Sequence, residues 1–198
     1  MKTIASGIQQ WTAFSQEKQL DFNGLLLTGN DHCILVDPPS MDASDRTTVL
    51  KGPKVDYILL TNRDHVREAD ACRRDFQAKI YAPAADAPLV DLMVDKTYED
   101  GELLPGGIWA IHLADMKSPG ESALFLDRGK GYLILGDALI GKPAGRLSLL
   151  PAEKFADVAK ARKSLARLLK YNFDTVLVGD GASILTNGKE TVRQAIEG

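Results

Sequence analysis

Acidic residues follow four of the most apolar segments of this 198-residue chain, and a histidine accompanies one of them. The segments are short and rich in Ile, Leu and Val, as buried strands are. The residues that follow them are Asp37, the adjacent pair Asp64 and His65, Asp137, and Asp180. Because ligands bind at the carboxyl ends of strands in open α/β sheets, these side chains are candidates for one shared site.

Several carboxylates and one imidazole at one sheet edge are costly together unless a cation lies among them. A divalent metal ion supplies that charge, and a basic side chain also serves. If a metal ion kept one open coordination position, its bound water would be acidified toward neutral pH. That water would attack a carbonyl or phosphoryl centre, and Asp64 or Asp180 would accept its proton.

The joint pattern carries this interpretation, because a single Asp after a strand is more often a turn or cap residue. Asp37 precedes Pro38 and Pro39 and is expected to be structural. His112 lies in an apolar run and is expected to be a hydrogen-bonded core histidine, and His32, in a predicted hairpin turn, is assigned no function. Nucleophilic catalysis is set aside because the chain has no Gly-x-Ser-x-Gly motif.

Short apolar runs bounded by turn residues predict most of the secondary structure that must position these groups. The predicted strands are residues 24–27, 33–36, 57–60, 79–82, 109–112, 123–126, 132–135 and 175–178. Helical spacing predicts helices over 66–76, 153–171 and about 189–196, and the loop-like intervals are 37–53 and 141–151. Strand pairs followed by alternating strands and helices predict an α/β sandwich with the sheets inside and the helices outside.

Composition favours one domain over residues 1–198 and a soluble, cytoplasmic protein. The net charge of −3 comes without an extended basic face, so a small-molecule substrate or ligand is expected rather than nucleic acid. Cys33 and Cys72 suit buried reduced thiols. No segment has the apolar length needed to cross a bilayer, so we expect no membrane partner, and the oligomeric state is left open.

Four segments together resemble the metallo-β-lactamase superfamily over nearly the whole chain. Residues 23–27 running into 34–37 are similar to the family's opening hairpin and its strand-ending aspartate, and 58–65 resembles the strand that leads into Thr-His-x-His-x-Asp-His. Residues 112–122, which lead to Asp137, resemble His-Thr-Pro-Gly-His-Thr-Pro-Gly-Ser, and 177–181 stands in the place of Pro-Gly-His-Gly. The resemblance implies an αββα sandwich of two mixed β-sheets with helices outside.

The resemblance also implies a degenerate metal centre. After Thr61 the motif is two residues shorter than the family's, Asn62 or Arg63 stands where His-x-His would be, and Met116 aligns with the third histidine. The first metal site is therefore expected to be deleted. The second site keeps Asp64, His65 and the bridging Asp137, with Asp180 replacing a histidine. This set of one nitrogen and three carboxylates suits a single zinc, manganese, iron or magnesium ion.

Two hypotheses follow from these residues. In the first, the protein is a mononuclear metal-dependent hydrolase of a small ester, thioester, lactone or phosphoester, with Asp64 and Asp180 as catalytic residues. In the second, it binds no metal and is a binding or structural protein, and the guanidinium of Arg63 replaces the metal charge among the acids. Lys117 is a second candidate for that role. The second hypothesis predicts that Arg63→Ala destabilises the fold.

Overall fold

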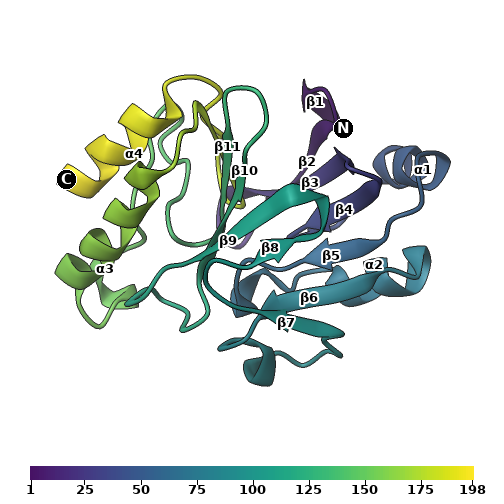
Figure 1. The fold of residues 1–198 in the computed structure, drawn as a ribbon, viewed down its shortest axis with the longest axis horizontal. Helices are drawn as coiled ribbons and strands as arrows, with labels where there is room; N and C mark the ends of the chain where they lie inside the picture. The colour runs from purple at the N-terminus through teal and green to yellow at the C-terminus, as the bar shows by residue number, and fades with distance from the viewer.

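Two β-sheets pack face to face in the computed structural model, which describes all residues from Met1 to Gly198, and helices cover their outer sides (Figure 1). The seven-stranded sheet has the order β1-β2-β3-β4-β5-β6-β7, and the five-stranded sheet has the order β12-β11-β10-β9-β8. Both sheets are mixed: strands β1 to β4 and β8 to β11 pair antiparallel, whereas β4 to β7 and the β11/β12 pair are parallel. The predicted αββα architecture is therefore confirmed.

All eight predicted strands are present, with ends shifted by a few residues. The first sheet contains β1 (Lys2–Ala5), β2 (Ile8–Ser15), β3 (Leu20–Gly29), β4 (His32–Val36), β5 (Tyr57–Leu59), β6 (Lys79–Pro83) and β7 (Lys96–Tyr98). The second contains β8 (Leu103–Leu104), β9 (Ile108–His112), β10 (Ser122–Leu126), β11 (Tyr132–Leu135) and β12 (Thr175–Val178). Strands β1, β2, β7 and β8 were not predicted, because they lie at or next to sheet edges and lack a continuous apolar run.

Four α-helices form the outer layers (Figure 1). They are α1 (Ala43–Lys51), α2 (Ala69–Phe76), α3 (Val158–Leu165) and α4 (Gly188–Glu197). Helices α2 and α4 confirm two of the three predicted helices. The prediction of one helix over 153–171 is wrong. The backbone is extended at Phe155, and helix α3 begins only after its N-cap residue Asp157. The Asp157 side chain accepts hydrogen bonds from the Ala159 and Lys160 amides and so caps α3.

Helix α1 corrects the expectation of a loop over residues 37–53. Asp42 caps it by accepting a hydrogen bond of 2.7 Å from the Asp45 amide. Only Asp45 and Val49 of this helix are buried, so its sequence carries no apolar stripe to reveal it. It lies on the outer side of the first sheet together with α2 (Figure 1).

The apolar residues form three layers of core. One cluster includes Leu59 of the first sheet and Leu124 of the second and fills the space between the two sheets. A second includes Leu35 and Phe76 and packs α2 against the first sheet, while a third includes Leu135 and Leu165 and packs α3 against the second sheet. Cys33 and Cys72 are free thiols buried in the layer beside α2, as expected. No helix has the length and apolar character that a membrane span requires.

Parallel pairing places the predicted site residues at one edge of the sandwich. Strands β4 and β5 run in the same direction, as do β11 and β12. Asp37 directly follows β4, and His65 lies in the 3-10 turn Arg63–His65 after β5. Asp137 and Asp180 each come two residues after the ends of β11 and β12. Parallel pairing brings Asp37 next to His65 in one sheet and Asp137 next to Asp180 in the other. The packing of the two sheets then brings the two pairs together.

Candidate functional site

The imidazole of His65 is the centre of the site, and Asp37 fixes its orientation. Nδ1 of His65 lies 2.8 Å from Oδ2 of Asp37, and both side chains are buried. Asp37 in turn accepts hydrogen bonds from the amide and the hydroxyl of Thr61, at 2.8 and 2.5 Å. Asn62 caps the turn that carries His65 by accepting from the amides of Asp64 and His65. The structural role expected for Asp37 is thus to hold the ring with Nε2 directed across the site.

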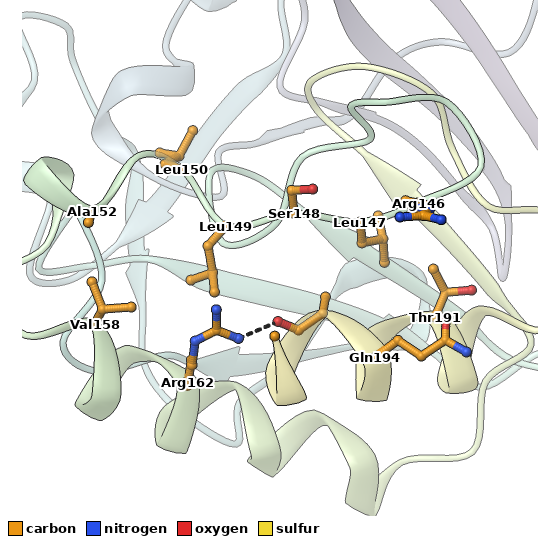
Figure 2. A pocket seen from close by; sticks show the side chains of 12 residues that line it. Arg146, Leu147, Ser148, Leu149, Leu150, Ala152, Val158, Arg162, Thr191 and Gln194 are labelled. Carbon is orange, nitrogen blue, oxygen red and sulfur yellow. Dashed lines mark hydrogen bonds between the residues drawn. The ribbon is translucent and has the colours of Figure 1, made fainter.

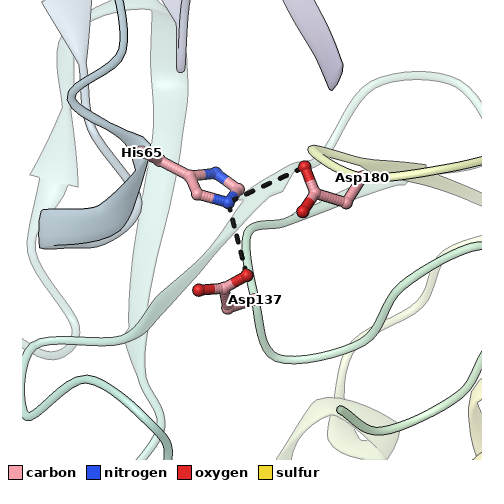
Figure 3. A group of neighbouring side chains, drawn as sticks. All are labelled: His65, Asp137 and Asp180. Atoms are coloured by element: carbon pink, nitrogen blue, oxygen red, sulfur yellow. Dashed lines mark ion pairs between the residues drawn. The ribbon is translucent and has the colours of Figure 1, made fainter. Parts of the chain in front are cut away.

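Nε2 of His65 faces two carboxylates (Figure 3). It lies 3.5 Å from Oδ1 of Asp137 and 4.0 Å from Oδ1 of Asp180. One nitrogen or oxygen from each of the three residues falls within 4.8 Å of the others, so this group alone has the spacing of a metal site. The side chains of His65 and Asp137 are only 3% and 6% exposed. The structure thus brings three of the four predicted ligands together.

Arg67 occupies the side of this group nearest Asp180. Its Nη2 donates a short hydrogen bond to Oδ1 of Asp180 and lies 3.3 Å from Nε2 of His65. The guanidinium also donates to the carbonyl oxygens of Asn23, at 3.0 Å, and Gly179, at 3.3 Å. Such a planar fork is satisfied on several sides at once, which a lysine could not reproduce. The guanidinium of Arg67 therefore holds a fixed position among the acids.

Lys117 occupies the opposite side of the group. Its Nζ lies 2.7 Å from Oδ2 of Asp137 and 3.0 Å from Oδ2 of Asp64. Asp64 is 38% exposed and lies at the rim, outside the cluster that has metal-site spacing. Asp64, which was predicted to be a metal ligand and a catalytic residue, therefore forms an ion pair with Lys117. Lys117 neutralises acids of the cluster, the role for which the sequence made it the second candidate.

Arg63 does not have the position expected of it. Its backbone amide donates to the buried carboxylate of Asp86 at 2.7 Å, but its side chain makes no hydrogen bond or ion pair. The charge assigned to Arg63 is supplied by Arg67 and Lys117 instead. Arg67 was not predicted, because it lies two residues beyond the Asp64-His65 pair, where the family motif gives no signal for a cation.

Protonation of the cluster follows from these contacts. Burial lowers the pKa of His65 and the charge of Arg67 lowers it further, but Asp37 and Asp137 outweigh both and raise it to about 10. Burial raises the pKa of Asp137, yet His65 and Lys117 together hold it well below its usual range. Burial raises the pKa of Asp180 despite the nearby His65 and Arg67 charges. The cluster is thus an ion-pair network with its own cations.

Asn62, one of the two residues predicted to replace the histidines of a first metal site, forms a second buried polar pair with Glu121. Asn62 donates from Nδ2 to Oε2 of Glu121 at 2.9 Å, and the Ala138 amide donates to Oε1 of the same carboxyl at 3.0 Å. Glu121 is fully buried, and burial raises its pKa well above the usual value. Met116, the predicted replacement for the third histidine, is buried in the core layer beside α3.

The other two histidines lie outside the cluster. The prediction that His112 is a hydrogen-bonded core residue is wrong, because it is half-buried and its ring makes no hydrogen bond. It lines a cavity of about 250 Å³ together with Tyr98 and Asp100. His32 was predicted to lie in a hairpin turn but begins β4 directly after that turn, and its Nδ1 lies 3.8 Å from Oδ2 of Asp56.

The ligand atoms of His65, Asp137 and Asp180 are of types that bind divalent ions, but their present hydrogen bonds leave no place for one. An imidazole and two carboxylates are suitable ligands for zinc, manganese or iron. However, Asp180 already accepts from Arg67, and Asp137 already accepts from Lys117. A metal ion would have to displace at least the guanidinium, which lies within 3.3 Å of the His65 nitrogen.

Comparison with known proteins places this arrangement in a family. The family model described as the metallo-beta-lactamase superfamily matches residues 1–198. No curated protein matches the chain. Among solved structures, DIM-1 metallo-beta-lactamase exposed to ceftazidime has a TM-score of 0.76 at 15% identity, with 99% of this chain and 95% of that chain covered.

Two further structures show the same fold. A metallo-beta-lactamase from Pontibacter korlensis has a TM-score of 0.76 at 15% identity and covers 97% of each chain. FIM-1 from Pseudomonas aeruginosa, in its mono-zinc form, has a TM-score of 0.72 at 17% identity, with 98% of this chain and 93% of that chain covered. The family model matches residues 1–198, and the three solved structures share the fold, so the chain belongs to the metallo-β-lactamase superfamily.

Proposed function

We propose that this protein is a metal-independent member of the superfamily that binds a small molecule and does not catalyse metal-dependent hydrolysis. The observation that carries the proposal is the position of Arg67, which bonds Asp180 and lies 3.3 Å from Nε2 of His65. These are two of the three groups that a metal ion would require. A permanent cation that is hydrogen-bonded on several sides competes directly with a divalent ion for the same atoms.

The distribution of charge supports the same proposal. Asp137 and Asp180, the two carboxylates nearest His65, each pair with a basic side chain from this chain. Buried carboxylates left without a partner would favour uptake of a cation, but paired ones have no such demand. The cluster then serves the fold by holding the loops after β4, β5, β11 and β12 at one edge.

A groove beside the cluster offers a place for the ligand. It has a volume of about 290 Å³, and its lining includes Phe14, Phe22, Pro39 and Arg67. The Arg67 guanidinium lies 4.5 Å from the centre of the Phe22 ring, so the floor combines an aromatic face with a cation. Such a lining suits a small planar or partly apolar molecule, which enters without touching the buried acids.

Metal content tests the proposal. The wild-type protein, Arg67→Gln and Asp137→Ala are purified without chelator, incubated with zinc, manganese or iron, desalted and subjected to elemental analysis. We expect the wild type to retain far less than one ion per chain, and Arg67→Gln to retain more because the competing cation is gone. Arg63→Ala is the matched control, because the Arg63 side chain makes no hydrogen bond or ion pair, and it should behave as the wild type.

Metal-dependent hydrolysis is the second candidate function, and the spacing of His65, Asp137 and Asp180 within 4.8 Å favours it. Its substrates would be small esters, thioesters, lactones or phosphoesters. Retention of about one ion per wild-type chain, lost in Asp137→Ala, would establish this alternative and contradict the proposal. Hydrolysis of an ester or phosphoester panel that appears only with added metal would do the same.

A further inference from the structure

A large cavity, separate from the acid cluster, lies on the outer side of the second sheet. It has a volume of about 670 Å³ and lies between the segment 146–150 and helices α3 and α4 (Figure 2). None of its lining residues belongs to the cluster around His65 or to the groove beside Arg67. Its volume is in the range of cavities that bind small organic molecules.

One end of this cavity is apolar. Figure 2 shows Leu149, Leu150, Ala152 and Val158 grouped there, with the Leu149 side chain directed toward the helices. Leu149, Leu150 and Val158 also pack against the core layer beside α3 and are only partly buried. Their remaining exposed surface is thus fixed in place by the core, and covering it with an apolar ligand would be favourable.

The other end is polar and carries an unpaired cation. Arg146, Thr191 and Gln194 are grouped there in Figure 2. The Arg146 side chain is exposed and makes no hydrogen bond or ion pair. Arg162, between the two ends, has a structural task, because its Nη1 donates to the carbonyl oxygens of Ala195 and Ile196 at 2.7 Å each.

The wall that carries Arg146 and Leu149 is held in position by the backbone. Ile140 and Ser148 exchange two hydrogen bonds of 2.9 Å, so the loop between them is closed at its base. Arg146 and Leu149 lie on either side of this bridge, and one faces the polar end of the cavity and the other the apolar end. The sequence predicted a loop over residues 141–151, and part of this loop lines the cavity.

We propose that the cavity binds an amphipathic carboxylate, such as a medium-chain fatty acid. The apolar chain lies along Leu149, Leu150 and Val158, and the carboxylate is bound by the guanidinium of Arg146. An arginine fork pairs with a carboxylate through two parallel hydrogen bonds, which gives the head group both charge and geometry. This site is independent of the proposed function and of any metal.

Fluorescence titration of the full chain with a dansyl-labelled medium-chain fatty acid tests the site. We expect saturable binding, displacement by decanoate, and much weaker displacement by decanol or decyltrimethylammonium. Arg146→Glu should weaken binding at least about tenfold. Leu149→Trp should abolish binding by filling the apolar end. Lys54→Glu, which makes the same charge change on an exposed lysine in the chain's first half, is the matched control and should bind as the wild type.

Three results would overturn the site. One is the absence of saturable binding to the wild type. Another is equal affinity of Arg146→Glu and Lys54→Glu for the labelled fatty acid, which would show that Arg146 does not bind the carboxylate. The third is equal displacement by decanoate and decyltrimethylammonium, which would show that the cavity does not select an anion. Circular dichroism of each variant establishes that a loss of binding is not a loss of fold.

Discussion

The guanidinium of Arg67 lies between the carboxylate of Asp180 and the imidazole of His65, donating to the first and approaching Nε2 of the second to 3.3 Å. Asp180 comes after β12 and His65 after β5, so Arg67 connects the two sheets at the edge where they meet. One side chain thereby neutralises a buried acid and fixes the relative position of two loops.

Removing Arg67 should therefore cost much more stability than removing Arg63. Arg67→Ala leaves the largely buried carboxylate of Asp180 without its partner, and breaking a buried pair in this way costs about 3 to 5 kcal/mol. Arg63→Ala removes a half-buried side chain that makes no hydrogen bond or ion pair, and it should change stability by less than about 1 kcal/mol. Urea unfolding followed by tryptophan fluorescence measures both. Similar losses in the two variants would contradict the assignment of the charge to Arg67.

Asp137 and Asp64 both pair with Lys117, but only Asp137 is at the centre of the cluster, so their substitutions should differ in their effect on stability. Asp137 is 6% exposed and also faces His65, whereas Asp64 is 38% exposed. Asp137→Asn should destabilise the protein by about 2 to 4 kcal/mol because two cations lose their buried partner. Asp64→Asn should cost less than about 1 kcal/mol, since solvent screens its pair. If Asp64→Asn were the more damaging change in thermal unfolding, the rim assignment would be wrong.

The strand ends of this site and one of its cations, Lys117, were predictable from the sequence, but Arg67 was not. Apolar runs ending in Asp37, Asp137 and Asp180 indicate buried strands, and parallel pairing then dictates where those ends meet. Arg67 instead reaches Asp180 because its own backbone adopts a left-handed conformation, with φ at 41°. A non-glycine residue adopts this conformation only where surrounding contacts enforce it, so the turn cannot be inferred from residue type.

Helix α1 shows a similar limit. Its residues Ala43–Lys51 are mostly polar, and only Asp45 and Val49 are buried, so no periodic apolar stripe marks the helix. The capping residue Asp42 was the available signal, but a single Asp is equally common in turns. In contrast, α4 has a clear apolar face and was predicted nearly to its ends.

Titration of His65 should reveal the network through the pH dependence of stability. Its folded pKa of about 10 lies above the ordinary 6.5, so protonation stabilises the folded state. That contribution is complete below about pH 6.5 and is lost as the pH rises through about 10. The groups facing the ring are Asp37, Asp137, Asp180 and Arg67. Nitrogen NMR of the imidazole at mildly alkaline pH should show both ring nitrogens protonated.

Asp37→Asn is the control for this titration, because it removes the carboxylate that raises the pKa most. In that variant the ring should lose its proton at a lower pH, and the decline of stability should begin correspondingly earlier. A wild-type ring that titrates near the ordinary value of 6.5 would contradict the ion-pair network described for the cluster.

The packing of the His65 ring against backbone gives a last prediction. A Cβ added to Gly179 would lie 2.4 Å from Cε1 and 2.9 Å from Nδ1 of His65, and the hydrogen bond between Nδ1 and Asp37 opposes movement of the ring. Gly179→Ala should therefore destabilise the protein by about 1 to 3 kcal/mol, the usual cost of overpacking. Gly52→Ala is the control: its Cβ would come no closer than 3.4 Å to any atom, and its φ of −81° suits alanine. Urea unfolding of the two variants decides the matter, since equal stabilities would mean that the ring is free to move and that Asp37 does not fix it.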